Sequence, residues 1–159
     1  MTVTKDKKPS GQESIKEASI YLKGNILEEL ANPDSFVSDE SYELLKFHGS
    51  YQGYDRDTAT ALKKAGKEKH WEFMLRMVCP GGRLTAPQYL VLDDICEKYA
   101  NGTLRITTRQ TFQFHCIVKS NLKKHIAAIN EILLSTIGGC GDVVRNVVCT
   151  AAPIKDKIH

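Results

Sequence analysis

The sequence predicts an α+β fold in which a sheet carries helices on one face. Apolar and polar residues alternate along an extended segment at 104–118. Stretches with helical periodicity lie before and after this segment, and each has its own start and stop signals. A further extended run, WEFMLRMV at 71–78, precedes them. The order is therefore strand, helix, strands and helix, which is typical of an α+β sandwich of sheet and helices.

The N-terminal residues 1–12 are polar and are predicted to form a disordered tail. Ser10 and Glu13 have the spacing of a capping box. Apolar residues after them recur on one helical stripe, which predicts a helix near 13–31 that ends at Asn32-Pro33.

The rest of the segment 13–70 is predicted to be an irregular arm that wraps the following domain. It holds one candidate strand at 44–47 and one candidate short helix at 57–65. Residues 71–136 then form the better-defined unit, a half-domain of ferredoxin-like type.

Capping signals place the helices of the half-domain. Thr85 and Gln88 have capping-box spacing, and the predicted helix runs to about Tyr99 before Asn101-Gly102 stops it. Ser120 is expected to cap a second helix, which Gly138-Gly139 stops. An extended segment, Val143–Cys149, follows and leads into Ala152-Pro153.

Composition indicates a globular protein and excludes several classes. The chain has 159 residues, 42% of them hydrophobic and 26% charged, with no apolar run long enough to span a membrane. The polar N-terminus lacks the apolar core of a secretory signal. Five cysteines without a C-x-x-C pair argue against disulfides and zinc, so reduced cytoplasmic thiols are expected. Cys140 and Cys149 are expected to be buried neutral thiols.

Positive charge concentrates in one part of the chain, although the formal net charge is only +3. No Asp or Glu occurs from Lys98 to Asn130. Such a field suits an anionic partner, and a solvated basic face is the alternative.

The segment 104–118 carries the strongest chemical signal. Strand alternation places its odd-numbered residues on one face and its even-numbered residues on the core face, with a bend expected near Thr108–Gln110. The odd face has no carboxylate and nearly every side chain on it can donate a hydrogen bond, which suits a planar polyanionic ligand. A solvated sheet face stays open as the alternative. The donor face comprises Arg105, Thr107, Arg109, Thr111, Gln113 and His115.

Five motifs occur in register along the chain. They are YLKGNILEEL at 21–30, FHGSYQGYDRD at 47–57, FMLR followed by PGG at 73–82, TTRQTFQFH at 107–115, and GDVVRNVVCT at 141–150. Together they resemble the assimilatory sulfite reductase hemoproteins of the siroheme/Fe4S4 nitrite and sulfite reductase superfamily. The resemblance covers nearly the whole chain from about residue 14 and matches the N-terminal portion of such proteins.

The resemblance implies a site and its cofactors. Residues that match the family's siroheme contacts should bind that cofactor, and those that match its sulfite-holding arginines, Arg76 and Arg145, should hold the substrate. Residues 137–159 would begin the siroheme-binding domain, which is truncated here. The implied reaction is the six-electron reduction of sulfite to hydrogen sulfide at siroheme coupled to Fe4S4. The implied siroheme contacts are Arg76, Arg105, Thr107, Thr108, Arg109, Thr111, Gln113, His115 and Arg145.

The resemblance also implies what lies elsewhere. The family's cluster cysteines belong to a later part of a longer chain, so no metal ligand is assigned here and this stretch alone is not expected to be active. The implied partners are sulfite, an NADPH flavoprotein or ferredoxin as electron donor, and the C-terminal half of the same protein. One departure concerns Cys116, which stands where glycine is usual after the histidine.

Three alternatives remain. The first is nitrite reduction within the same superfamily. The second is a non-catalytic basic α/β domain that binds an anionic ligand. The third is a reader of single-stranded nucleic acid, in which bases stack on aromatic rings beside arginines. Phe112 and Phe114 have the opposite parity to Arg105 and Arg109, which argues against that third class, and no nucleic acid or membrane partner is predicted.

Overall fold

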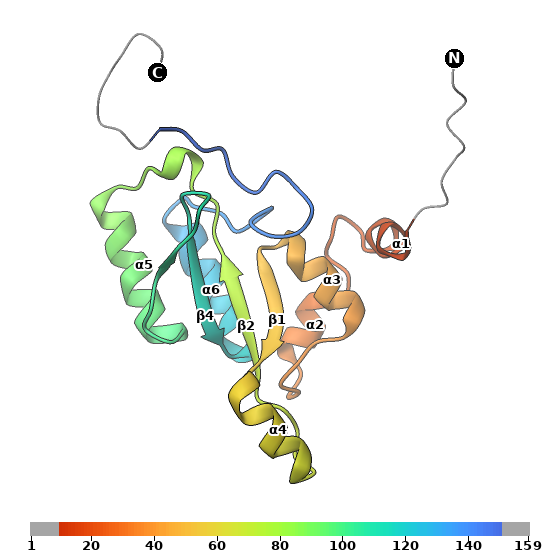
Figure 1. Ribbon diagram of the computed structural model, residues 1–159. Coiled ribbons are helices and arrows are strands. Elements are labelled where there is room, and N and C mark those ends of the chain that lie inside the picture. The colour runs from red at the N-terminus through yellow and green to blue at the C-terminus, as the bar shows by residue number, and fades with distance from the viewer. Residues whose placement is uncertain (1–9, 151–159) are drawn as a thin grey trace, which may run out of the picture.

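A computed structural model describes residues 10–150 of the chain. Figure 1 shows a central sheet with helices packed beside it, and α4 projecting from one end. The helices are α1 Gly11–Ala18, α2 Ile26–Ala31, α3 Asp39–Phe47, α4 Arg56–Lys64, α5 Ala86–Tyr99 and α6 Lys119–Glu131, with a single 3-10 turn at Pro80–Gly82. The strands are β1 Ser50–Tyr54, β2 Trp71–Arg76, β3 Arg105–Ile106 and β4 Phe112–Ile117.

The sheet is antiparallel throughout, with the strand order β1-β2-β4-β3. Along β2 the side chains of Phe73 and Leu75 are fully buried, whereas Glu72, Met74 and Arg76 are only partly covered. One face of the sheet therefore packs on helices and the other face carries none. This arrangement confirms the predicted α+β class with helices on one face.

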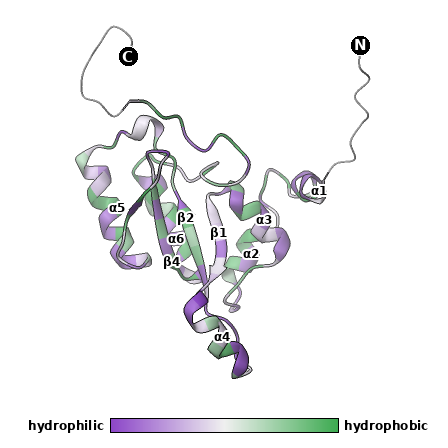
Figure 2. Cartoon of the chain, viewed as in Figure 1, coloured by the Kyte–Doolittle hydropathy of each residue, from purple (hydrophilic) through white to green (hydrophobic). Residues whose placement is uncertain are grey.

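The core lies between the sheet and helices α5 and α6. Phe114 of β4 is fully buried, as are Leu92 of α5 and Leu122 and Ile129 of α6. Figure 2 shows hydrophobic residues on α5 and α6 interleaved with hydrophilic ones, as expected of helices with one buried side. α4 has no buried residue, so it contributes little to this core.

The predicted single helix near 13–31 is wrong, because the chain breaks it into α1 and α2. The Ser19 hydroxyl donates to the Lys16 carbonyl at 2.6 Å and accepts from the Leu22 amide at 3.1 Å, which competes with helix continuation. Three consecutive residues then adopt positive φ angles. Ser10 makes no side-chain cap, so the expected capping box is absent. The left-handed residues are Ile20, Tyr21 and Leu22.

The segment expected to be an irregular arm is largely regular. It forms α3, β1 and α4, and the candidate strand at 44–47 is the last turn of α3. The predicted short helix at 57–65 is confirmed as α4. β1 pairs with β2 from Ser50 to Tyr54, so this segment supplies the outer strand of the sheet. The domain limits at 12, 70 and 136 stay predictions, and residues 1–9 and 151–159, including Ala152-Pro153, lie outside the described residues.

A buried lysine joins the N-terminal segment to the half-domain. Lys119 is only 6% exposed at the start of α6. Its ammonium donates to the Glu29 carbonyl at 2.7 Å, and also to the Asn32 side chain and the Phe36 carbonyl. Because three acceptors surround the charge, it is stabilised inside the protein and holds the end of α2 against α6.

Of the two helix caps predicted in the half-domain, one forms and the other does not. Thr85 and Gln88 form the complete capping box of α5, as expected. Ser120 caps nothing, because α6 already begins at Lys119 and Val118 occupies the cap position. The expected extended segment Val143–Cys149 forms no strand and is irregular.

The segment 104–118 is a hairpin rather than one bent strand. The bend expected near 108–110 is confirmed: the Gln110 amide donates to the Thr107 carbonyl at 3.1 Å, and β3 then pairs with β4. The core assignment of Ile106 is wrong, since it lies 74% exposed on the outer strand. The assignment of Cys116 to the core is also wrong, because a β-bulge between β2 and β4 turns its side chain outward.

Cys116 should be a strained position. It is exposed and has φ +58, a left-handed conformation that favours glycine. We expect Cys116→Gly to raise the free energy of unfolding by roughly 0.5–1 kcal/mol, because relief of strain exceeds the added entropy of the unfolded chain. Urea unfolding measures the change. Cys116→Ala, which keeps the strain and removes the thiol, should bring no gain, and an equal gain in both variants would disprove this explanation.

A histidine is buried in the core without hydrogen bonds. Both ring nitrogens of His125 on α6 are buried and have no partner among residues 10–150. The ring packs edge-on against Phe114 at a centroid distance of 4.3 Å. Burial lowers the pKa of His125 from 6.5 to about 4, so the folded protein holds it neutral.

This histidine should make the fold sensitive to acid. Its folded-state pKa lies below its unfolded-state value, so its contribution is complete above about pH 6.5 and is lost as the pH falls toward 4. At pH 5 we expect a loss of about 2 kcal/mol relative to pH 7.5. His125→Leu fills the site without a titrating group, so urea unfolding of that variant should lose less stability over this range. An identical pH dependence in both proteins would rule His125 out as the cause.

Candidate functional site

Three polar side chains form a row across the helix-free face of the sheet. Gln113 of β4 pairs with Arg76 of β2 on one side and with Arg105 of β3 on the other. Residues paired in this way lie side by side on the same face of an antiparallel sheet. The strand pairing therefore places two guanidinium groups on either side of one amide, although the residues lie far apart in the sequence.

Gln113 helps to orient Arg76. With the amide turned so that its oxygen faces the guanidinium, that oxygen accepts from Arg76 Nε at 3.0 Å and also from Nη2. Arg76 Nη1 donates to the Gly139 carbonyl with a separation of 3.5 Å. The guanidinium is thus held by neutral acceptors, which leave its positive charge uncompensated.

Two glycines hold the backbone of Arg76. The Arg76 amide donates to the Gly49 carbonyl at 2.8 Å. A Cβ atom on Gly49 would lie 2.6 Å from the Arg76 carbonyl oxygen, and one on Gly139 would lie 2.4 Å from it. Real Cβ atoms do not approach backbone oxygens this closely, so only glycine allows this packing at either position.

The hairpin tip and Arg76 enclose a cavity of about 290 Å³. The Thr107 hydroxyl accepts from the Arg109 amide at 3.3 Å, which closes the tip between β3 and β4. Thr108 and Arg109 are exposed, so their side chains are available to a ligand. The lining residues are Arg76, Ile106, Thr107, Thr108, Arg109 and Gln113.

His115 lies on the same strand as Gln113, two residues further along. Its Nε2 atom is buried and has no hydrogen-bond partner among residues 10–150. Burial lowers the pKa of His115, and the positive charges of Arg105 and Arg76 lower it further, although Glu72 acts in the opposite direction. This lowered pKa favours the neutral ring, and the buried Nε2 is a polar atom that a ligand on this face would satisfy.

Arg145 reaches this part of the molecule from the irregular segment 143–149. Its Nε donates to the Gly141 carbonyl at 3.0 Å. Cys140 is buried near both Arg145 and Arg76; burial raises the pKa of its thiol to about 11, although the two guanidinium charges favour the thiolate. The prediction of a buried neutral thiol is confirmed for Cys140. It is wrong for Cys149, which is exposed.

Thr111 does not lie with the other predicted site residues. Its side chain is 2% exposed, and its hydroxyl donates to the Met77 carbonyl at 2.5 Å. The residue follows the hairpin tip, where the chain turns back into the core. The structure therefore gives Thr111 a part in holding β4 against the end of β2 and no place in the cavity.

The site has an uncompensated positive charge. Within residues 10–150, no arginine of the site forms an ion pair with a carboxylate. The same part of the chain contains no cluster of three or more His, Cys, Asp or Glu side chains placed to hold a metal ion. None of its helices has the length and apolar character needed to cross a membrane. The arrangement can bind an anion with several carboxylate or oxyanion groups.

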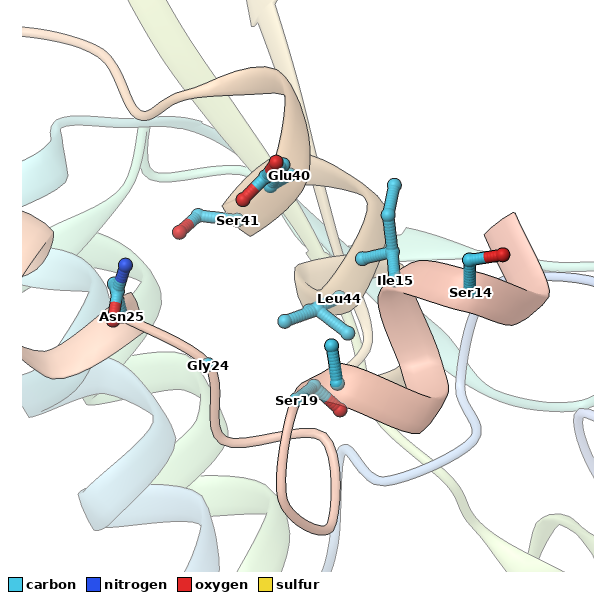
Figure 3. A pocket seen from close by; sticks show the side chains of 9 residues that line it. Ser14, Ile15, Ser19, Gly24, Asn25, Glu40, Ser41 and Leu44 are labelled. Atoms are coloured by element: carbon cyan, nitrogen blue, oxygen red, sulfur yellow. The ribbon is translucent and has the colours of Figure 1, made fainter. Parts of the chain in front are cut away.

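A separate cavity of about 330 Å³ lies between α1, the turn after it and α3 (Figure 3). Its polar groups include the hydroxyls of Ser14, Ser19 and Ser41 and the carboxylate of Glu40. No lysine or arginine lines it, and none of the predicted site residues reaches it. It therefore does not share the anion-binding character of the sheet face.

The profile of the family described as "Nitrite/Sulfite reductase ferredoxin-like half domain" matches residues 66–132. The matched range contains β2, β3, β4 and both core helices, and it includes Arg76 and the donor residues of 105–115. The predicted ferredoxin-like half-domain is thereby confirmed.

Relatives extend the similarity over nearly all of the chain. The "Sulfite reductase [NADPH] hemoprotein beta-component" of Staphylococcus haemolyticus is 49% identical over 97% of this chain, and that of Geobacillus thermodenitrificans is 46% identical over 97%. Among solved structures, the NirA protein of Mycobacterium tuberculosis superposes over 85% of this chain with a TM-score of 0.67 and 26% identity. The chain spans 27% of the length of the two curated relatives and 26% of the solved chain.

The sequence did not predict the residues that hold the separate segments of the site together. Gln110 and Asn146 bridge the hairpin tip and the segment that carries Arg145. Gly49 and Gly139 shape the surroundings of Arg76. The only signal for the amides was their position, since each directly follows one of the predicted arginines.

Proposed function

We propose that this chain is the N-terminal part of a siroheme-dependent sulfite reductase, in which its helix-free sheet face forms one wall of the cofactor and substrate site. The complete protein would reduce sulfite to hydrogen sulfide in six electrons. The observation that carries the proposal is the row of Arg105, Gln113 and Arg76 beside a cavity without carboxylates. The names of the curated relatives agree with it.

The residues present fit a cofactor ringed by carboxylates. His115 has a buried nitrogen without a partner, and Arg105 and Arg109 are exposed without ion pairs among residues 10–150. Arg105, Arg109, Thr107, Thr108, Gln113 and His115 would hold the carboxylates of siroheme. When bound, siroheme and its Fe4S4 cluster would pass electrons from the external donor to the substrate, and the cluster ligands would come from the C-terminal half of the protein.

Arg76 and Arg145 would bind the oxygens of sulfite. Each guanidinium offers a planar pair of donors and a delocalised positive charge, which match the oxygens of a small oxyanion. Gln113 and the Gly139 carbonyl orient Arg76 without neutralising it. This fixed positive field would favour the negative charge that develops as oxygen leaves as water.

Expression of the complete protein tests the proposal. We expect chlorin absorbance at one siroheme per chain and consumption of a reduced artificial donor that depends on sulfite. NADPH should support turnover only when a separate flavoprotein is added. A complete protein that is folded and carries no chlorin, after expression in cells that synthesise siroheme, would contradict the proposal.

Nitrite is the second candidate substrate, because the matched family includes reductases of both anions. The same guanidinium groups would bind either anion. Competition between sulfite and nitrite on the complete protein distinguishes them, and we expect the higher kcat/KM for sulfite.

A further inference from the structure

The hairpin tip carrying Arg109 and the segment carrying Arg145 are joined by two side-chain amides. Asn146 directly follows Arg145, and its Nδ2 donates to the Arg109 carbonyl and to the Cys79 carbonyl, each at 2.8 Å. Gln110 directly follows Arg109, and its Nε2 donates to the Cys149 carbonyl at 2.6 Å while its Oε1 accepts from the Cys149 amide at 3.1 Å. Each amide therefore reaches from one arginine-bearing segment to the backbone of the other.

These bridges supply most of the order of the segment 143–149. This segment belongs to no strand or helix. Among residues 10–150, it is held further by the Gly81 amide, which donates to the Val147 carbonyl at 2.8 Å, and by the Cys149 thiol, whose Sγ lies 3.3 Å from the Gly81 carbonyl oxygen. Because so few bonds hold it, the position of Arg145 depends on the two amides rather than on regular secondary structure.

Packing at the turn Pro80–Gly82 supports the same link. A Cβ atom on Gly82 would lie 2.9 Å from Gln110 Cβ, and one on Gly81 would lie 3.4 Å from Cys149 Sγ. The tip, the turn and the segment are therefore in close contact, and the glycines allow Gln110 to reach Cys149. Both bridges are neutral, so they fix the arginines without lowering the positive charge of the site.

We propose that Gln110 and Asn146 are positioning residues that set the separation between the siroheme-binding tip and the sulfite-binding Arg145. This inference rests on the proposed function. Without the bridges, Arg145 would sample several positions, and its hydrogen bonds to the anion would be made in only a fraction of them. The cavity would then lose sulfite affinity although every charged residue is still present.

The test uses the complete protein with Gln110→Met, which keeps the side-chain volume and removes both hydrogen bonds, and with Asn146→Ala. Gln88→Met is the matched control, because Gln88 also bridges distant segments, donating from Nε2 to the Ile132 carbonyl at 2.9 Å, but lies in the capping box of α5. Hydrogen–deuterium exchange of the peptide 141–150, siroheme content and sulfite kinetics are measured on each variant.

For Gln110→Met and Asn146→Ala we expect exchange in 141–150 to be roughly fivefold to tenfold faster and the sulfite KM to rise roughly tenfold. Gln88→Met should change neither. Unchanged exchange, or faster exchange with an unaltered KM at full siroheme content, would overturn the positioning role. If the unmodified complete protein failed to reduce sulfite, the proposed function would fall, and the exchange data alone would then uphold or overturn the bridging role.

Discussion

Arg76→Ala and Arg145→Ala should each raise the sulfite KM of the complete protein by roughly 10–100-fold while siroheme stays bound. A hydrogen bond to a charged group contributes roughly 1.5–3 kcal/mol, and 1.4 kcal/mol corresponds to about a factor of ten. Lysine keeps the charge but loses the planar pair of donors, so Arg76→Lys should be impaired less than Arg76→Ala without reaching the activity of the unmodified protein.

Cofactor content and sulfite kinetics must be scored separately on the same purified variants. Arg105→Ala and Arg109→Ala should lower siroheme content first, since these side chains lie exposed on the cofactor-binding face. Arg56→Ala on the projecting helix α4 is the charge-matched control and should change neither quantity. Normal sulfite kinetics in Arg76→Ala and Arg145→Ala at full siroheme content would show that neither arginine binds substrate.

Gly49→Ala should lower the free energy of unfolding by about 2–5 kcal/mol, which is the largest stability effect expected from a single methyl group here. The residue has φ +87, and the added Cβ would lie 2.4 Å from the Thr136 carbonyl oxygen and 2.6 Å from that of Arg76. The substitution therefore combines a left-handed alanine with two backbone collisions. Urea or thermal unfolding of the purified protein measures the loss.

A substitution at Gly66 separates the cost of a left-handed alanine from the cost of the backbone collisions. Gly66 has φ +65, but nothing lies within 4 Å of the position that its Cβ would take. Gly66→Ala therefore reports the conformational cost alone, about 1 kcal/mol. If Gly49→Ala proved no more destabilising than Gly66→Ala, the close packing of Gly49 against Arg76 would be of no consequence for stability.

Local signals in the sequence determined much of the half-domain. The capping box of Thr85 and Gln88 and the apolar period after it predicted α5, because both depend on residues within one or two helical turns. Alternation along 104–118 predicted a donor face, and Gln113 and His115 of β4 lie on it. These features need no knowledge of distant residues.

The same local reasoning failed where distant residues compete with local preference. The apolar stripe of 13–31 predicted one helix, but the Ser19 hydroxyl and the contact of His48 Nε2 with the Leu22 carbonyl at 2.8 Å stabilise a turn instead. Alternation assigned Cys116 to the core, and a bulge set by pairing with β2 turned it outward. A single added residue reverses the faces of a strand, so alternation cannot reveal a bulge.

Only the tertiary structure brings the residues of the site together. Strand register places Arg105 and Arg76 on either side of Gln113, and register depends on how the whole sheet packs on its helices. Gln110 and Asn146 then bring the segment of Arg145 to the hairpin tip through hydrogen bonds that span 39 and 37 residues of sequence. The sequence by itself thus determined which side chains are donors and on which elements they lie, whereas long-range pairing decided which of them meet, because hydrogen bonds between distant segments leave no periodic signal in the chain.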